Sequence, residues 1–178
     1  TFYRELDSLL ATIRIEKTQG NLLADILKIL EENFSQTVCI RHGRLYEQRG
    51  EDFLLVYPQK PRPEWARRIA KNNKAVELVS HNRSYIFDTA KMNAVFYQTL
   101  PENEIPLCTA IWVHNQETSW LLIFELTGGW IREEINLFMN AIRTSLNYRL
   151  FTDMMGGRLE QAVQIQKSLL PKVAPKFA

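Results

Sequence analysis

The stretch 107-LCTAIWVHNQETSWLLIFELT-127 decides the fold of this chain, because it contains two apolar segments typical of paired β-strands. The segments 107–114 and 119–127 are separated by Asn115-Gln116-Glu117-Thr118, four residues of a length that suits a hairpin loop. Gly128-Gly129 ends the second segment. We therefore expect an antiparallel hairpin with long, apolar strands.

Helical patterns lie on both sides of this hairpin. In the first third of the chain, apolar residues recur at spacings of three and four, namely Leu22, Leu23, Ile26, Leu27, Leu30 and Phe34. A second helix is expected from Ile131, with one apolar side made of Ile135, Phe138, Met139, Ile142 and Leu146. Paired strands with helices grouped at both ends predict an α+β fold, in which a central antiparallel sheet is covered by the terminal helices.

The middle of the chain is expected to supply the remaining strands and some short helices. The predicted elements are strands within 37–48 with a turn at His42-Gly43, a strand over 53–57, a helix over 64–74, a strand at 85–87 and a helix within 89–100.

Composition places the chain among ordinary globular proteins. Hydrophobic residues make up 46% and charged residues 24%, and the net charge of +2 is far from that of a polybasic nucleic-acid-binding chain. No apolar run approaches the roughly 20 residues of a membrane-spanning helix. Cys39 and Cys108 lie far apart in apolar segments, so we expect reduced thiols and a cytoplasmic protein without membrane or nucleic-acid partners.

The order of elements resembles a GAF domain, a small-ligand sensor. Three stretches carry the resemblance: 22-LLADILKIL-30, the hairpin 108–127 and the helix 130-WIREEINLFMNAIRTSL-146. PAS domains share a strand-rich sensor architecture, but a helix before the first strand and a long helix after the last favour the GAF type. The signature of cyclic-nucleotide-binding GAF domains is absent, so a domain without a small ligand stays an alternative.

The resemblance implies a ligand between the sheet and the middle region, within about residues 57–106. Aromatic walls and a few fixed polar groups are typical of such pockets. The candidate residues are Tyr57, Trp65, Arg83, Tyr85, Asp88, Phe96 and Tyr97. The competing interpretation is that the aromatic residues belong to the core and Asp88 caps a helix.

The end of the chain carries a second resemblance. The segment 161-QAVQIQKSLLP-171 resembles the connector that precedes the catalytic domain of bacterial regulatory serine phosphatases, at Ala162, Ile165, Gln166, Leu169, Leu170 and Pro171. This implies three regions: an N-terminal helix at 1–20, a GAF-like domain at 21–150 and a connector at 151–178. The manganese or magnesium of such a phosphatase would bind only in a catalytic domain after Ala178.

The connector is also expected to form a dimer. A narrow apolar seam with a period near 3.5 predicts a parallel coiled coil between two copies, through Leu159, Ala162, Val163, Gln166, Leu169 and Leu170. We therefore expect a homodimeric sensor domain that gates a protein serine/threonine phosphatase and responds to a small ligand or a regulatory protein. The alternative is a ligand-free dimerisation or adaptor module attached to another output domain.

Other candidate chemistry is weak in this sequence. His42, His81 and His114 have no metal-ligand spacing, and the two cysteines behave by default as small hydrophobic residues. The basic segment 62–74 is better explained as a solvated helix face than as an anion site. No nucleophile motif or phosphate-binding loop is present, so we expect no metal, no cofactor and no enzymatic activity in this chain.

Overall fold

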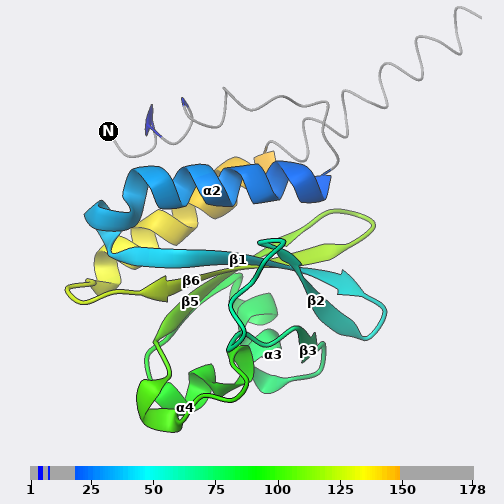
Figure 1. The fold of residues 1–178 in the computed structure, drawn as a ribbon. Helices are drawn as coiled ribbons and strands as arrows, with labels where there is room; N and C mark the ends of the chain where they lie inside the picture. Colours follow the sequence, from blue (N-terminus) through cyan, green and yellow to red (C-terminus); the bar gives the residue numbers. More distant parts are fainter. Residues whose placement is uncertain (1–3, 6–7, 9–18, 149–178) are drawn as a thin grey trace, which may run out of the picture.

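A six-stranded antiparallel sheet forms the centre of the protein. The computed structural model describes residues 4–5, 8 and 19–148, and within them the strand order is β3-β2-β1-β6-β5-β4 (Figure 1). The strands are β1 (Ile40–Arg49), β2 (Asp52–Tyr57), β3 (Arg68–Ala70), β4 (Ser84–Phe87), β5 (Cys108–His114) and β6 (Ser119–Leu126). Strand β6 lies near the middle of the sheet, which agrees with its continuous apolar sequence.

Two helices cover one face of the sheet. Helix α2 (Gln19–Val38) and the helix over 132–148 lie together above the strands in Figure 1. Phe138 packs edge-on against Phe34 of α2, with ring centroids 5.8 Å apart, and against Phe124 of β6 at 5.9 Å. The apolar stripes predicted for both helices are buried in this core. The α+β fold with terminal helices on the sheet is therefore confirmed.

The middle of the chain covers the opposite face. Its elements are α3 (Lys74–Asn82), α4 (Ala90–Asn93) and the 3-10 helices η1 (Ala94–Phe96) and η2 (Glu102–Glu104). A second hydrophobic core, which includes Phe53, Val76, Phe87 and Ile123, fills the space between these elements and the sheet. The sheet is thus buried on both faces.

The hairpin of β5 and β6 is confirmed, including its loop. The pairing runs from Cys108 opposite Glu125 to His114 opposite Ser119. In the loop, the side-chain oxygen of Asn115 accepts hydrogen bonds from the backbone N–H groups of Glu117 and Thr118, both at 2.8 Å. This Asx-type arrangement explains why the chain turns at this point.

The predicted turn at His42-Gly43 is wrong, because β1 continues through it. The register with β6 shifts between Arg41 and Arg44, so the two intervening residues form a bulge, and His42 has a φ of 52°. A Cβ at Gly43 would lie 3.1 Å from the Phe124 ring and 3.3 Å from a Leu27 methyl group. The glycine therefore permits close packing of strand and helix, rather than a reversal of the chain.

The predicted helix over 64–74 is also wrong. Residues 68–70 form β3 beside β2, and Trp65 forms an isolated bridge with Tyr97. The helix begins later, at α3, where the Asn73 side chain accepts from the N–H of Ala75 at 2.9 Å. Trp65 and Ile69 are four residues apart, a spacing that places side chains on one side of a strand as well as of a helix.

The predicted helix within 89–100 is shorter than expected. Thr89 caps α4, and helical structure ends after Phe96 because Tyr97 has an extended backbone. The strands predicted at 53–57 and 85–87 are confirmed as β2 and β4. The predicted domain boundaries stay untested, since residues 9–18 and 149–178 lie outside the described part of the chain.

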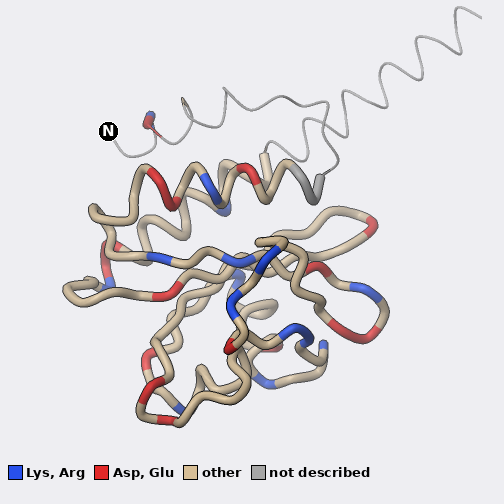
Figure 2. The backbone as a smooth tube through the Cα atoms, viewed as in Figure 1, with Lys and Arg blue, Asp and Glu red and all other residues tan. Residues whose placement is uncertain are grey.

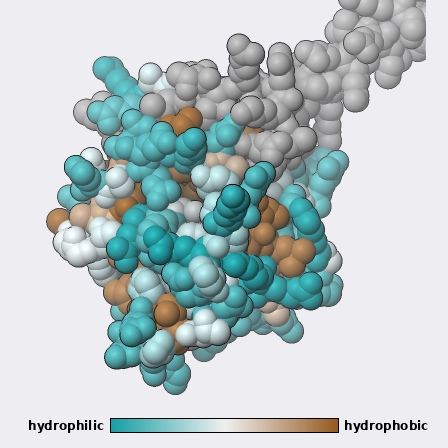
Figure 3. Space-filling model, in the orientation of Figure 1, coloured by the Kyte–Doolittle hydropathy of each residue, from teal (hydrophilic) through white to brown (hydrophobic). Residues whose placement is uncertain are grey.

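Charged residues of both signs are interspersed over the backbone (Figure 2), in agreement with the small net charge of +2. The face in Figure 3 is mainly hydrophilic, with scattered apolar side chains. None of the helices in the described residues is long and apolar enough to span a bilayer.

Candidate functional site

A cluster of polar side chains is buried on the face of the sheet that α3 and α4 cover. It consists of Arg44, Tyr46, Tyr97, Cys108 and Glu125, each with at most 7% of its surface exposed. We refer to these five residues as the Arg44 cluster. Arg44 and Tyr46 are alternate residues of β1 and so share a face, while Cys108 and Glu125 are paired across β5 and β6.

The Arg44 guanidinium lies at the centre of this cluster. Its Cζ atom is 4.5 Å from the Trp65 ring centroid and 4.6 Å from that of Tyr97, so the cation contacts two aromatic faces. One guanidinium nitrogen donates to the carbonyl oxygen of Phe96 at 2.7 Å and to the Tyr46 hydroxyl at 3.3 Å. These contacts offset the free-energy cost of removing the guanidinium charge from water.

Glu125 supplies the negative charge. Its carboxylate accepts hydrogen bonds from the Tyr97 hydroxyl at 2.6 Å, from Nδ1 of His42 at 2.9 Å and from Nε of Arg41 at 3.2 Å, and it lies 3.7 Å from Arg44. Burial raises the pKa of Glu125, but the hydrogen bonds from Tyr97 and His42 and the nearby positive charge outweigh this effect. The net pKa therefore lies below the usual value, and Glu125 is ionised at neutral pH.

His42 connects this carboxylate to the proline-rich segment after β2. Its Nε2 atom lies 3.0 Å from a guanidinium nitrogen of Arg62, which can only donate a hydrogen bond. Nε2 must then be the acceptor, and the proton of the neutral ring is on Nδ1, facing Glu125. This pattern defines one tautomer of His42.

Cys108 contacts the same Tyr97 hydroxyl that donates to Glu125. Its sulfur atom is 3.2 Å from the Tyr97 hydroxyl, and its backbone N–H donates to the side-chain oxygen of Asn93 at 2.9 Å. Burial raises the pKa of the Cys108 thiol to about 11, although the Arg44 charge acts in the opposite direction. Burial likewise raises the pKa of the Tyr97 hydroxyl. Both groups are therefore neutral near pH 7.

One hydrogen-bond donor within the Arg44 cluster and one beside it are unused. Nε of Arg44 and Nε1 of Trp65 are buried and find no acceptor among the residues that the structure describes. Buried donors are normally satisfied by protein or water. The site thus has spare capacity for an oxygen acceptor.

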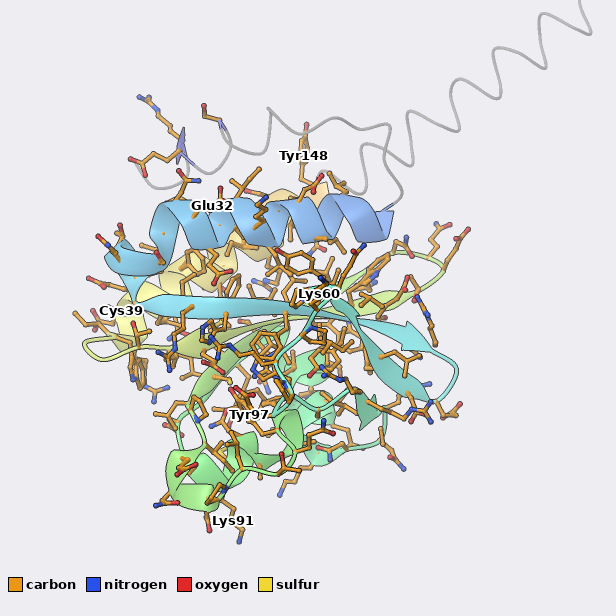
Figure 4. All side chains as sticks on the ribbon, viewed as in Figure 1. Glu32, Cys39, Lys60, Lys91, Tyr97 and Tyr148 are labelled. Carbon is orange, nitrogen blue, oxygen red and sulfur yellow. The ribbon has the colours of Figure 1, made fainter. Side chains whose placement is uncertain are left out.

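A pocket of about 370 Å³ lies on the same face, between α3 and α4. Its apolar lining consists of Ala75, Leu78, Phe87, Met92 and Val95, and its polar lining of Asn73, Lys74 and Lys91. The Phe87 ring packs against Phe96 with centroids 5.0 Å apart, and Phe96 in turn contacts Arg44 through its carbonyl group. Figure 4 shows Tyr97 between the sheet and α4, and Lys91 at α4.

The structure brings together three of the predicted ligand residues, Trp65, Phe96 and Tyr97, around Arg44. Tyr85 is close to them, because its ring packs against Phe87 at 4.9 Å. All four belong to, or pack against, the second hydrophobic core, as the competing core interpretation expected. None of the four lines the pocket.

The other three predicted residues lie elsewhere. Tyr57 packs against the first core, on the opposite face of the sheet. Arg83 is exposed and ends α3 in the left-handed conformation. Asp88 is paired with Arg132 at 2.6 Å rather than acting as a helix cap. The predicted dimer residues between 159 and 170 lie outside the described part of the chain.

Arg44, Tyr46, Glu125 and Lys91 were missed in the sequence analysis, whereas Cys108 and the basic segment 62–74, which contains Lys74, were considered there and set aside. One signal was available for Glu125, which is a single acid within the apolar strand 119-SWLLIFELT-127 and so needs a buried partner. Among the residues that the structure describes, no three His, Cys, Asp or Glu side chains are placed to hold a metal ion.

Comparison with known proteins gives structural matches alone. No protein-family model matches the chain, and no curated protein matches its sequence. Free methionine-R-sulfoxide reductase from Neisseria meningitidis, in complex with its substrate, matches with a TM-score of 0.59 and 12% identity, over 86% of this chain and 89% of that chain. The structure of fRMsr of Staphylococcus aureus in complex with substrate matches with a TM-score of 0.57 and 14% identity, over 81% of this chain and 95% of that chain. The reduced form of the Staphylococcus aureus protein matches with a TM-score of 0.55 and 15% identity, over 81% of this chain and 94% of that chain.

These matches correct one expectation. The three matched structures are named as reductases, so a chain of this fold can be an enzyme, and this contradicts the expectation that the chain has no enzymatic activity. The phosphatase connector receives no support from these comparisons and stays a prediction. At 12% to 15% identity the likeness concerns the fold alone. The chain has an α+β, GAF-like fold, as its sequence predicted.

Proposed function

We propose that this chain binds a small molecule in the pocket between α3 and α4. The observation that carries the proposal is a pocket of about 370 Å³ with five apolar and three polar lining residues. This size and this mixture of groups are typical of sites for small organic ligands, which span roughly 300–1,000 Å³. Leu78, Met92 and Val95 line the pocket and are only half-buried, so a ligand would cover apolar surface that water now contacts.

A ligand screen with matched variants tests this proposal. Metabolites would be screened by thermal shift and by backbone amide NMR, and a bound ligand is expected to shift resonances of α3 and α4 and to raise the melting temperature. Val95→Phe should fill the pocket and abolish these effects. Val56→Phe is the control, since Val56 is half-buried against the opposite core. Ligand effects that survive Val95→Phe, or map elsewhere, would contradict the proposed site.

We infer further that the domain acts as the signal-input unit of a bacterial protein phosphatase. A physical route supports this role: Asp88 follows the pocket residue Phe87, and its carboxylate contacts Arg132 in the first turn of the helix over 132–148. A ligand that shifts β4 would thereby bias the helix that leads to the connector, provided that it binds two arrangements with different affinities.

Two measurements test the signalling role. The coding sequence after Ala178 should contain the acidic metal-binding motifs of the phosphatase domain, and their absence would refute this output. Asp88→Asn should leave ligand affinity unchanged and remove ligand-induced NMR shifts in the helix over 132–148. Shifts that persist in this variant would show that the Asp88–Arg132 contact does not transmit the signal. A domain that binds no metabolite and still dimerises would instead be an adaptor module.

A second candidate function is reduction of a small sulfoxide, which the names of the structural neighbours raise. Cys108 is the thiol to test, because it lies beside the Tyr97 hydroxyl and 4.0 Å from the Arg44 guanidinium. Its full burial and raised pKa oppose the reaction, so the sulfoxide could reach it only if the segment that carries Tyr97 moved away. In such a reaction two thiols give two electrons, and the products are a sulfide, a disulfide and water. The purified chain would be assayed with free methionine-R-sulfoxide and a dithiol reductant. Turnover that Cys108→Ser abolishes would support reductase activity, and absence of turnover would refute it.

A further inference from the structure

The pocket between α3 and α4 is lined by positive charge without negative charge. Lys74 and Lys91 line it from the two helices, and no acidic side chain does so. Neither lysine forms an ion pair with a carboxylate among the residues that the structure describes. The pocket therefore presents two cationic groups beside an apolar wall.

The acidic residues nearest in sequence do not line the pocket. Glu77 is exposed in the first turn of α3 and does not line the pocket. Asp88 precedes α4, but its carboxylate is held by Arg132 at 2.6 Å. Neutralisation of the two lysines is thus left to solvent ions or to a bound molecule.

The orientation of α3 also favours an anion in the pocket. Asn73, Lys74 and Ala75 are the N-cap and first residues of this nine-residue helix, and all three line the pocket. The N-terminus of a helix carries a partial positive charge from its aligned peptide dipoles. The helix dipole and the two lysines therefore favour an anion at this side of the pocket.

We propose that the pocket selects a small carboxylate with an apolar chain, bound with its chain against Leu78, Met92 and Val95 and its carboxylate near Lys74 and Lys91. This inference rests on the proposed ligand-binding function and specifies the class of ligand. The volume of about 370 Å³ suits one small molecule rather than a peptide. A neutral or cationic ligand of the same length would leave the lysines unpaired or repel them.

Three probes of equal chain length test the proposal: octanoate, 1-octanol and octylamine. Each probe would be titrated into the full chain. Its affinity would be taken from the shifts of the backbone amide NMR signals of α3 and α4. Octanoate should bind about 3- to 10-fold more tightly than octanol, as expected for partly exposed charge-assisted contacts, and octylamine should bind most weakly.

Matched variants separate charge from apolar contact. Lys74→Gln and Lys91→Gln should each lower the affinity for octanoate about 3-fold and leave the affinity for octanol unchanged. Lys60→Gln is the control, because Lys60 is an exposed lysine between β2 and β3 that does not line the pocket (Figure 4). Leu78→Ala should lower the affinities for octanoate and octanol by the same factor.

The outcomes are distinguishable. If octanol and octanoate bind equally, or octylamine binds best, the carboxylate selectivity is refuted while the pocket remains a ligand site. If no probe shifts α3 or α4 and the metabolite screen also fails, the proposed ligand-binding function is refuted with it. Octanoate binding that Lys74→Gln and Lys91→Gln leave unchanged would place the anion elsewhere and overturn the inference.

Discussion

Replacing Arg44 by Met removes the guanidinium from the centre of the Arg44 cluster and leaves a flexible apolar chain in its place. The Phe96 carbonyl oxygen loses its charged donor at 2.7 Å and keeps only the backbone N–H of Ala66 at 3.0 Å. The Trp65 and Tyr97 rings lose the cation about 4.5 Å from their centroids. Glu125 keeps closer partners, His42 at 2.9 Å and Arg41 at 3.2 Å.

The magnitude follows from these contacts. A hydrogen bond from a charged donor contributes about 1.5–3 kcal/mol, and a desolvated cation–π contact contributes about 2 kcal/mol. Removing the desolvation penalty of Arg44 and burying the Met chain offset part of this loss. We therefore expect the free energy of unfolding to fall by about 3 kcal/mol, a large part of the roughly 5–15 kcal/mol of a typical domain.

Urea unfolding monitored by tryptophan fluorescence measures this change, provided that the slope of the transition is unchanged. Lys60→Met is the control, because a substitution at an exposed site should change stability by about 0.5 kcal/mol or less. A loss below about 1 kcal/mol in Arg44→Met would refute the energetic reasoning.

Arg44→Lys separates charge from geometry. Lysine keeps the positive charge but lacks the planar group that stacks between two rings and donates to Phe96. If stacking and donor geometry stabilise the cluster, Arg44→Lys should lower the free energy of unfolding by about 2 kcal/mol or more. A variant as stable as the wild type would show that charge alone matters.

Three further predictions concern single residues. Because the folded-state pKa of Glu125 is lowered, its stabilisation is present above the unfolded-state value of about 4.3 and is lost as pH falls. The free energy of unfolding should therefore fall less between pH 6 and pH 3 in Glu125→Gln than in the wild type, and equal slopes in urea titrations would contradict this. A thiol reagent should modify the half-buried Cys39 in the native protein and spare Cys108, so Cys39→Ser should react only on unfolding, and fast labelling would contradict the burial of Cys108. Gly43→Ala should destabilise by about 1–3 kcal/mol, because its Cβ would lie 3.1 Å from Phe124. Calorimetry on this variant would contradict the packing argument if stability were unchanged.

Local patterns predicted much of the fold. The period of the apolar residues in 22–34 and 135–146 gave the two helices that cover the sheet, and the paired apolar runs gave the β5–β6 hairpin. These patterns are informative because each reports which side of one element is buried. The misread segments were those whose local signal fits two structures, a bulge or a turn at His42-Gly43 and a strand or a helix at Trp65 and Ile69.

The candidate site was predictable only in part. Trp65, Phe96 and Tyr97 were expected to lie near one another, and they do so around Arg44. The cluster that they surround was not expected, because its charges come from β1 and β6. Of the pocket lysines, Lys74 lies in the basic segment 62–74, which we interpreted as a solvated helix face, and Lys91 looked like an ordinary surface residue.

The sequence by itself determined an α+β chain with an apolar hairpin and two amphipathic helices, since alternation and helical period are properties of neighbouring residues. Only the tertiary structure decided which polar groups meet. Arg44, Tyr97 and Glu125 are brought together because β1 pairs with β6 and the segment after α4 crosses the same face. Such contacts depend on strand order and packing, which no local pattern encodes.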